Sequence, residues 1–295
     1  MSTELTRRRF LGLAGAGALS AAVLGGCGRE SADALTRVRA GGQIAIGLSQ
    51  LEPFSYTDAS GRPTGESPEV ARAVVESLGG SGLTAVQVDY ERLISGLGDG
   101  QFDMIAIGLT MTPLRCQQVA FSRPDYIAKT ALAVPKDNPK GLGTLGGVAR
   151  SGARLGVLAN GAEIEFARDA GVPDANVTTF PSQSALFRGV IDGRVDASAL
   201  TRISLLDEQR RNAGSDVEVT AGFYPTVGGR QVIVGGGFAF RQGDDEFRAE
   251  FDRALTDLQR SGHWLDAVRP FGLTDDNLPP PELTTAQLCA RTARA

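Results

Sequence analysis

The segment "LISGLGDGQFDMIA", residues Leu93–Ala106, has a counterpart later in the chain, "LFRGVIDGRVDASA" at Leu186–Ala199. Each copy reads as a helix that a glycine ends, followed by an apolar strand. Two copies do not make a solenoid, which needs three or more stacked units. We interpret them as one unit present in two similar α/β lobes, the alternative being chance recurrence of a common unit. The first copy shares six positions with the second: Leu93, Gly96, Asp99, Gly100, Asp103 and Ala106.

Strand and helix patterns alternate around the first copy. "QIAIGLS" (43–49) and "LTAVQVD" (83–89) read as strands, and "SPEVARAVVESLG" (67–79) between them reads as a helix. This alternation predicts an α/β fold of mostly parallel sheets flanked by helices. The strands after the two copies end at Thr110 and Thr201. Because ligands collect outside the carboxyl ends of such strands, we expect a ligand cleft between the lobes.

Two segments are expected to carry the chain between the lobes. "ALAVPKDNPKG" (131–141) leaves the first lobe as a strand, and "QVIVGGGFAF" (231–240) returns to it. We therefore assign residues 42–130 and 236–290 to lobe 1 and residues 131–235 to lobe 2. Strands that cross twice between lobes form a natural hinge.

Residues 1–26 are expected to be an export signal. Arg7, Arg8 and Arg9 precede the uncharged run Leu11–Gly26, which is short for a membrane-spanning helix. "TRRRFL" resembles a twin-arginine signal, and "LGGC", which ends at Cys27, resembles a lipobox. A lipid on Cys27 would anchor the protein to the outer face of the cell membrane through a tether over residues 27–41. The alternative is a cysteine in an ordinary cleaved leader.

Charge and composition argue against several functions. The formal charge is -4 and no basic stripe is visible, so we expect no nucleic-acid partner. The only histidine is His263, and no cysteine–histidine cluster has metal-ligand spacing. "GLGTLG" (141–146) matches a dinucleotide pattern, but "GVARSG" (147–152) gives no strong helix after it. We expect no metal, no cofactor and no catalysis.

Arg115 stands at a helix start, where the backbone dipole repels a cation. In "GLTMTPLRCQQVAFSRPDY" (108–126), Thr112 is the expected N-cap and Pro113 the first helical residue. An arginine there is explained if the helix-start amides, the threonine hydroxyls and the guanidinium converge on one anion. We predict that Arg115 grips a carboxylate in bidentate fashion, with a hydroxyl from Thr110 or Thr112. The alternative is a surface arginine paired with Asp125.

Aromatic residues are expected on the opposite wall of the cleft. "LEPFSY" follows the first strand and offers Glu52, Phe54 and Tyr56, and Tyr90 follows the next strand. Aromatic faces near a carboxylate suit a flat or cationic group. The alternative for Phe54 and Tyr56 is packing beneath a loop.

Two cysteines follow Cys27, namely Cys116 and Cys289. Cysteines outside the cell often pair, so we predict a Cys116–Cys289 disulfide that holds the C-terminal tail on lobe 1. Two free buried thiols are the alternative.

Several segments together resemble the family 3 extracellular solute-binding proteins of ABC importers. They are "PFSYTDASGRPTGESPEVARAVVESLG", "LISGLGDGQFDMIAIGLTMTPLRCQQVAFSRPDY", "GRVDASAL" and "GGFAFRQGDDEFRAEFDRAL". The resemblance implies a type II periplasmic-binding-protein fold, no catalysis and a membrane permease as partner. It also implies that Arg115 grips the ligand carboxylate with help from Thr110. We expect a monomer that closes around a small molecule.

Within that family, "GESPEVARA", "TPLRCQQVAFS" and "PFGLTDDNLP" resemble the ectoine/hydroxyectoine-binding branch. That branch has an acidic residue where Leu51 stands and an aromatic residue where Thr110 stands. Polar amino-acid receptors, the alternative, keep the threonine but usually carry an aspartate where Thr201 stands. A dehydratase-like enzyme on the same fold, with Glu52 as its acid, is the alternative of another class. From lobe 2 we expect ligand contacts by Asn160, Gly161, Ala162 and Thr201.

Overall fold

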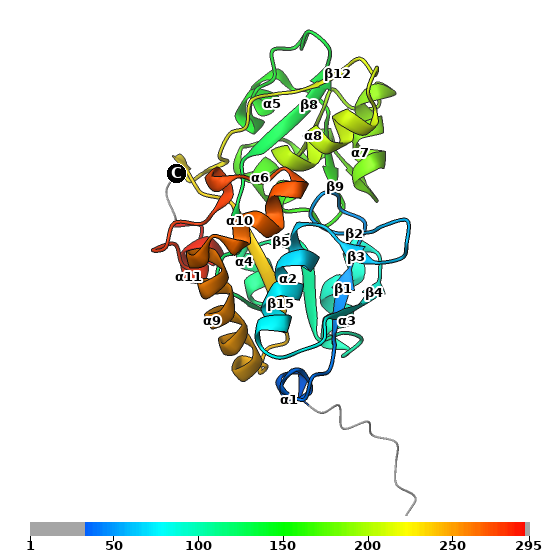
Figure 1. Ribbon diagram of the computed structural model, residues 1–295. Helices are drawn as coiled ribbons and strands as arrows, with labels where there is room; N and C mark the ends of the chain where they lie inside the picture. The colour runs from blue at the N-terminus through cyan, green and yellow to red at the C-terminus, as the bar shows by residue number, and fades with distance from the viewer. Residues whose placement is uncertain (1–32, 293–295) are drawn as a thin grey trace, which may run out of the picture. The chain divides into compact units, whose positions relative to one another are not determined.

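Residues 33–292, which the computed structural model describes, contain two main β-sheets with helices on both faces (Figure 1). The first sheet runs in spatial order through β4 (Leu83–Gln87), β1 (Ile44–Leu48), β5 (Met104–Thr110), β15 (Gly235–Phe240) and β6 (Ala120–Phe121), with β7 (Tyr126–Ile127) also paired to β15. Strands β4, β1 and β5 are parallel, whereas β15 is antiparallel to β5.

The second sheet repeats this arrangement. Its spatial order is β10 (Val177–Phe180), β9 (Leu155–Leu158), β11 (Ala197–Thr201), β8 (Thr130–Pro135) and β12 (Val217–Val219). Strands β10, β9 and β11 are parallel, and β8 is antiparallel to both of its neighbours. Each sheet thus has a parallel half followed by an antiparallel strand, and the predicted two-lobed α/β fold is confirmed.

Side chains along each strand point alternately to the two faces of its sheet, and each face packs against its own set of helices. In β5, Met104 and Ala106 pack on one face with α1 (Ala34–Arg39), α2 (Glu66–Ser77), α9 (Asp245–Ser261) and α10 (His263–Val268). Ile105 and Ile107 point to the other face, where α3 (Leu93–Gly98) packs. The second sheet lies between α5 (Leu145–Ser151) with α6 (Ala162–Asp169) and α7 (Gln183–Ile191) with α8 (Arg202–Arg211).

The two copies of the repeat fold alike. Gly96 of α3 lies against the ring of Phe102, and Gly189 of α7 lies against Phe180, so that an added Cβ would approach those rings to 3.0 and 2.5 Å. Asp103 accepts a backbone hydrogen bond from Ala45 at 2.9 Å, and Asp196 accepts the equivalent bond from Arg154 at 2.8 Å. In each lobe the aspartate therefore ties the start of one strand to the first residues of its neighbour.

The segment predicted as a tether contains a short helix that packs on the first lobe. Residues 34–39 form α1, and its Leu35 and Val38 are buried in the core of the first lobe. Helix α1 therefore belongs to the folded lobe, because its apolar face has a partner there. The export signal and Cys27 lie outside the described residues.

The remaining elements are short. They are the hairpins β2 (Tyr56–Thr57) with β3 (Pro63–Thr64) and β13 (Thr226–Val227) with β14 (Arg230–Gln231), the helices α4 (Pro113–Cys116) and α11 (Thr285–Cys289), and the 3₁₀ turns Tyr90–Arg92, Asp174–Asn176, Arg269–Phe271 and Asp275–Asn277. Among the helices of residues 33–292, none combines the length and apolar character needed to cross a membrane.

Candidate functional site

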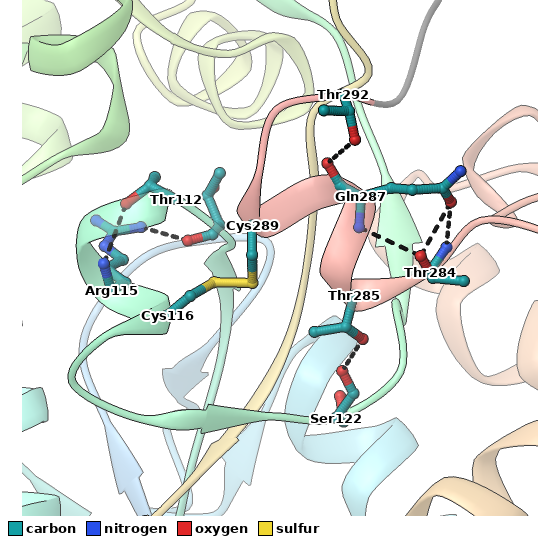
Figure 2. Close-up of a disulfide and its surroundings, with 10 residues drawn as sticks. Thr112, Arg115, Cys116, Ser122, Thr284, Thr285, Gln287, Cys289 and Thr292 are labelled. Carbon is teal, nitrogen blue, oxygen red and sulfur yellow. Dashed lines mark hydrogen bonds between the residues drawn. A yellow bond between two sulfur atoms is a disulfide. The ribbon is translucent and has the colours of Figure 1, made fainter.

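Arg115 is held at the start of the single-turn helix α4. The side chain of Thr112 accepts the backbone N–H of Arg115 at 3.3 Å, and Pro113 is the first helical residue, as the sequence predicts. Figure 2 shows this cap beside the helix α11. The Thr112 hydroxyl is fully buried and forms the cap of this helix.

The guanidinium of Arg115 lies between the lobes. Its Nη1 donates to the carbonyl oxygen of Thr110 at 2.8 Å, and its Nη2 donates to the hydroxyl of Tyr90 at 2.8 Å. The same Nη2 donates to the carbonyl oxygen of Asn160 in lobe 2 at 2.7 Å. Asn160 has a φ of 55°, a left-handed conformation that asparagine tolerates. Arg115 is therefore a buried residue of the cleft, only 6% exposed, and no surface arginine.

The alternative partner of Arg115 is engaged elsewhere. Asp125 is fully buried and accepts a hydrogen bond from the indole N–H of Trp264 at 2.8 Å. A second buried carboxyl group, that of Glu66, interacts with Asp125. The predicted alternative of an Arg115–Asp125 pair is therefore wrong.

A small cavity lies where the ends of β5 and β11 meet the loops of both lobes. Its volume is about 20 Å³, which is room for about one water molecule. A larger ligand can therefore enter only if the lobes move apart. Its walls bring together residues from lobe 1 and lobe 2: Leu51, Phe54, Tyr90, Gly108, Thr110, Leu158, Ala162, Glu163, Leu200, Thr201 and Ser204.

Five predicted site residues thus share one cavity. Phe54 is 2% exposed, lies directly beneath Gly108 and packs on Tyr126 at a ring distance of 4.8 Å. Tyr90 also lies below the Arg115 guanidinium, 5.8 Å from ring centre to Cζ. The five predicted residues that line the cavity come from both lobes: Phe54, Tyr90 and Thr110 from lobe 1, and Ala162 and Thr201 from lobe 2.

Glu163 is the acidic residue of this cavity, and it was not among the predicted site residues. It lies in the first turn of α6, directly after the predicted contact residues, and is 5% exposed. Burial raises the pKa of Glu163 to about 7, although its own backbone N–H and the charge of Arg115 oppose the shift. The segment "ANGAE" (159–163) could have identified Glu163. It places an acidic residue at the start of a helix that follows a strand of lobe 2, and such a helix start faces the cleft.

Two predicted residues do not serve the cavity as expected. The carboxylate of Glu52 pairs with Arg211 of lobe 2 at 3.1 Å, and its carbonyl oxygen accepts a bond from Gln183 at 2.7 Å. Glu52 therefore links the lobes beside the cavity, so its predicted role near the ligand cation is corrected. The amide of Gly161 donates to the carbonyl oxygen of Leu158 at 2.8 Å, so it is already used within its own loop.

Larger openings flank the small cavity on two sides, and Tyr90 borders all three spaces. One opening of about 570 Å³ includes the polar residues Gln50, Asp89 and Gln183. The other, of about 640 Å³, includes Arg115, Leu114 and Ile164. Both lie between residues of lobe 1 and lobe 2, so the crevice extends beyond the central cavity.

Cys116 and Cys289 form a disulfide, with Cα atoms 5.9 Å apart (Figure 2). The bond joins α4, the helix of Arg115, to α11 near the end of the chain. Within residues 33–292 no group of three or more metal-ligating side chains occurs.

Known proteins resemble this chain over most of its length. Residues 44–272 match the family described as bacterial extracellular solute-binding proteins, family 3. A probable amino-acid ABC transporter periplasmic-binding protein of Sinorhizobium fredii (strain NBRC 101917 / NGR234) is 28% identical, over 87% of this chain and 86% of that protein. The lysine/arginine/ornithine-binding periplasmic protein of Escherichia coli (strain K12) is 27% identical, over 74% and 83%.

A solved structure, EhuB in complex with hydroxyectoine, superposes with a TM-score of 0.76. It is 32% identical and the match covers 86% of this chain and 97% of that one. Members of the matched family are extracytoplasmic binding proteins that pass a small molecule to an ABC permease. The chain belongs to the family 3 bacterial extracellular solute-binding proteins and is a solute-binding protein of the ABC amino-acid transporter type.

Proposed function

We propose that the protein is a lipid-anchored receptor that captures a small zwitterionic carboxylate, with ectoine or hydroxyectoine as the ligand. The observation that carries this proposal is a pair of opposite charges in one cleft. Arg115 comes from lobe 1 and Glu163 from lobe 2, and each is at most 6% exposed. A ligand with an anionic and a cationic end interacts with both lobes at once, so its binding favours their approach.

The carboxylate end is assigned to Arg115. Its guanidinium already donates to two carbonyl oxygens, those of Thr110 and Asn160. A ligand carboxylate that replaces the Asn160 carbonyl as acceptor gains a charge-assisted bidentate bond, which is stronger than a bond to a neutral carbonyl. Capture is therefore an exchange of hydrogen-bond acceptors. The lobes separate enough to admit the ligand, and its carboxylate then replaces the Asn160 carbonyl oxygen as the acceptor from Arg115.

The cationic end is assigned to Glu163 and the aromatic residues beside it. Phe54 and Tyr90 line the same cavity as Glu163. A delocalised cationic ring stacks on aromatic faces, and each cation–π contact contributes about 0.5–2 kcal/mol. The likeness to EhuB, whose structure contains hydroxyectoine, supports this ligand class. Glu163 occupies the cavity from lobe 2, whereas the sequence pattern pointed to an acid from lobe 1.

A polar amino acid is the second candidate ligand, because the named relatives include amino-acid-binding proteins. Its carboxylate would occupy the same place on Arg115, and its α-ammonium group would face Glu163. Binding by calorimetry separates the two candidates. We expect hydroxyectoine and ectoine to bind with micromolar or tighter dissociation constants, and L-arginine and L-glutamine to bind more weakly. Binding of an amino acid with no response to either ectoine would assign the second ligand class.

The anchoring proposal rests on the motif that ends at Cys27. We propose that Cys27 is lipidated after export and that the protein acts as a monomer on the outer face of the membrane. Mass spectrometry of the membrane fraction tests this directly. We expect a chain that begins at Cys27 and carries acyl groups, and an unmodified secreted chain would overturn the anchor without affecting the ligand proposal.

A further inference from the structure

The C-terminal segment is attached to lobe 1 beside Arg115. Helix α11 is linked to α4 by the Cys116–Cys289 disulfide, and the Thr285 hydroxyl donates to the carbonyl oxygen of Ser122 at 2.8 Å (Figure 2). Leu288 is 3% exposed and packs in the same apolar cluster as α3. The segment is therefore fixed to the lobe whose α4 presents the carboxylate-binding arginine.

Arg291, two residues after this disulfide, reaches across to lobe 2. Its Nη1 pairs with Asp169 and its Nη2 pairs with Glu165, both on α6. Its guanidinium also lies over the ring of Phe166, with Cζ 5.2 Å from the ring centre. The Arg291 side chain is 11% exposed. Two carboxylates and one aromatic face of a single helix thus hold this side chain.

The backbone conformation of Arg291 is independent evidence that the contacts of its side chain with α6 are stabilising. Arg291 follows α11 with a φ of 52°, and Thr292 donates back to the carbonyl oxygen of Gln287 at 2.9 Å. Helices that end in this way usually place glycine at the left-handed position, because a side chain there costs energy. An arginine at such a position is unfavourable for the turn alone. Its contacts with α6 offset that cost.

Helix α6 is also the helix that carries Glu163 into the central cavity. We propose that Arg291 is a positioning residue, an ionic latch that joins the disulfide-anchored C-terminal segment of lobe 1 to α6 of lobe 2 and holds the lobes together around the ligand. The latch breaks whenever the lobes separate, because its partners lie on different lobes. The latch therefore favours the closed state, in which the lobes are close together, and it slows ligand release. This inference requires lobe closure but no particular ligand.

Arg291→Gly is the most informative variant. Glycine suits the left-handed backbone position, so it preserves the end of α11 while it removes the guanidinium. Arg291→Lys keeps a positive charge but loses the fork that reaches two carboxylates at once. Arg253→Ala is the matched control, because Arg253 is exposed and pairs with Glu250 on its own helix, within lobe 1. It removes one charge and one ion pair without affecting contact between the lobes.

Energy transfer between two dyes reports the lobe separation without any ligand. The exposed Asp99 and Asp192, which occupy equivalent positions of the two lobes, are replaced by non-canonical residues for labelling, so that no thiol is used. In the full-length protein we expect Arg291→Gly to shift the equilibrium from the short to the long distance by about tenfold, within the usual range of coupling between sites. Arg291→Lys should be intermediate, and Arg253→Ala should match the wild type.

A double-mutant cycle identifies the partners. We expect Glu165→Gln combined with Asp169→Asn to shift the inter-dye distance as much as Arg291→Gly does. Adding Arg291→Gly to these two substitutions should change the distance no further. Stopped-flow release of hydroxyectoine, with L-arginine as a second probe, should be about tenfold faster in Arg291→Gly. Unchanged distances in Arg291→Gly, or additive effects in the cycle, would overturn the latch. If neither probe binds the wild type, the proposed ligand fails, while the distances still decide the latch.

Discussion

Arg115 of lobe 1 donates a hydrogen bond of 2.7 Å to the carbonyl oxygen of Asn160 in lobe 2. The residue proposed to bind the ligand carboxylate is thus also a bridge between the lobes. A ligand must compete with a neutral carbonyl for a guanidinium that is otherwise satisfied by Thr110 and Tyr90. Because a carboxylate is the stronger acceptor, the exchange favours anionic ligands over neutral analogues of the same shape.

Replacement of Arg115 should abolish measurable ligand binding. We expect Arg115→Ala to weaken the affinity for hydroxyectoine by about 2–5 kcal/mol, because the carboxylate would be left buried without its cation. Arg115→Lys should recover only part of the loss, since lysine cannot make the bidentate contact. Isothermal titration calorimetry measures both. The exposed Arg210, which pairs with Asp207 on its own helix, provides Arg210→Ala as a control that should bind like the wild type. Equal affinity of Arg115→Ala and wild type would contradict the assignment.

The affinity for a zwitterion should depend on pH through Glu163. Burial raises the pKa of Glu163 to about 7, and the carboxylate form is the one that attracts a cation. The affinity should therefore rise as the pH increases through about 7, by roughly tenfold between pH 5.5 and 8.5. Binding at pH 6 should also release a proton from Glu163, which calorimetry in buffers of different ionisation enthalpy detects.

Glu163→Gln supplies the matching control. The amide keeps the shape of the side chain but has no titrating carboxyl group, so the pH dependence and the proton release should both disappear. The affinity of the variant should stay near the low-pH affinity of the wild type. A steep pH dependence that survives in Glu163→Gln would assign the titration to another group.

The sequence allowed prediction of those features that depend on local signals. Thr112 and Pro113 predict the start of α4, because their residue types favour the N-cap and the first helical position, and the cap forms as expected. The repeated segments predict two alike lobes because each contains its own helix, glycine stop and strand. Asp103 and Asp196 make equivalent backbone contacts in the two lobes, so the likeness extends to hydrogen bonding.

Residues whose roles depend on contact between the lobes could not be assigned in advance. Glu163 and Glu52 are both acidic residues after a strand, yet only Glu163 lines the cavity, because Arg211 of the other lobe pairs with Glu52. Arg291 near the end of the chain shows no local pattern, since its partners lie more than a hundred residues away. Such side chains are directed by tertiary packing rather than by their neighbours in the sequence.

The Cys116–Cys289 bond should contribute strongly to stability. It joins residues 173 positions apart. In the chain-entropy model such a loop stabilises the fold by about 5 kcal/mol. We expect Cys116→Ser/Cys289→Ser to lower the free energy of unfolding by roughly 3–5 kcal/mol in urea titrations. Cys27→Ser, which leaves the bond intact, serves as the control and should unfold like the wild type. Equal midpoints for all three proteins would show that the bond is absent or energetically neutral.

The buried pair of Glu66 and Asp125 should make stability depend on pH. Burial raises the pKa of Glu66 well above its ordinary value and raises that of Asp125 to about 6. Each carboxyl group has one buried oxygen without another partner, which suits one shared proton. Because these pKa values are higher in the folded state than in the unfolded chain, the stabilisation is fully present below about pH 4. The part that comes from Asp125 is lost as the pH rises through about 6, and the part that comes from Glu66 is lost as the pH rises through the raised pKa of that residue.

Glu66→Gln should flatten this dependence. The amide donates to Asp125 at every pH, so the variant should exceed the wild type in unfolding free energy by roughly 1–2 kcal/mol at pH 8 and approach it at pH 5. Thermal and urea unfolding across that range measure the difference. Glu76→Gln, an exposed change on the same helix, should leave the wild-type profile in place. A Glu66→Gln protein that loses stability with rising pH as steeply as the wild type would contradict the shared proton.

A crystal structure of the complex with hydroxyectoine tests the central claim most directly. We predict that the ligand carboxylate lies within hydrogen-bond distance of both Nη atoms of Arg115, that the Asn160 carbonyl no longer accepts from it, and that the cationic ring lies between Phe54, Tyr90 and Glu163. A ligand bound elsewhere, with the bond from Arg115 to Asn160 still in place, would contradict the account.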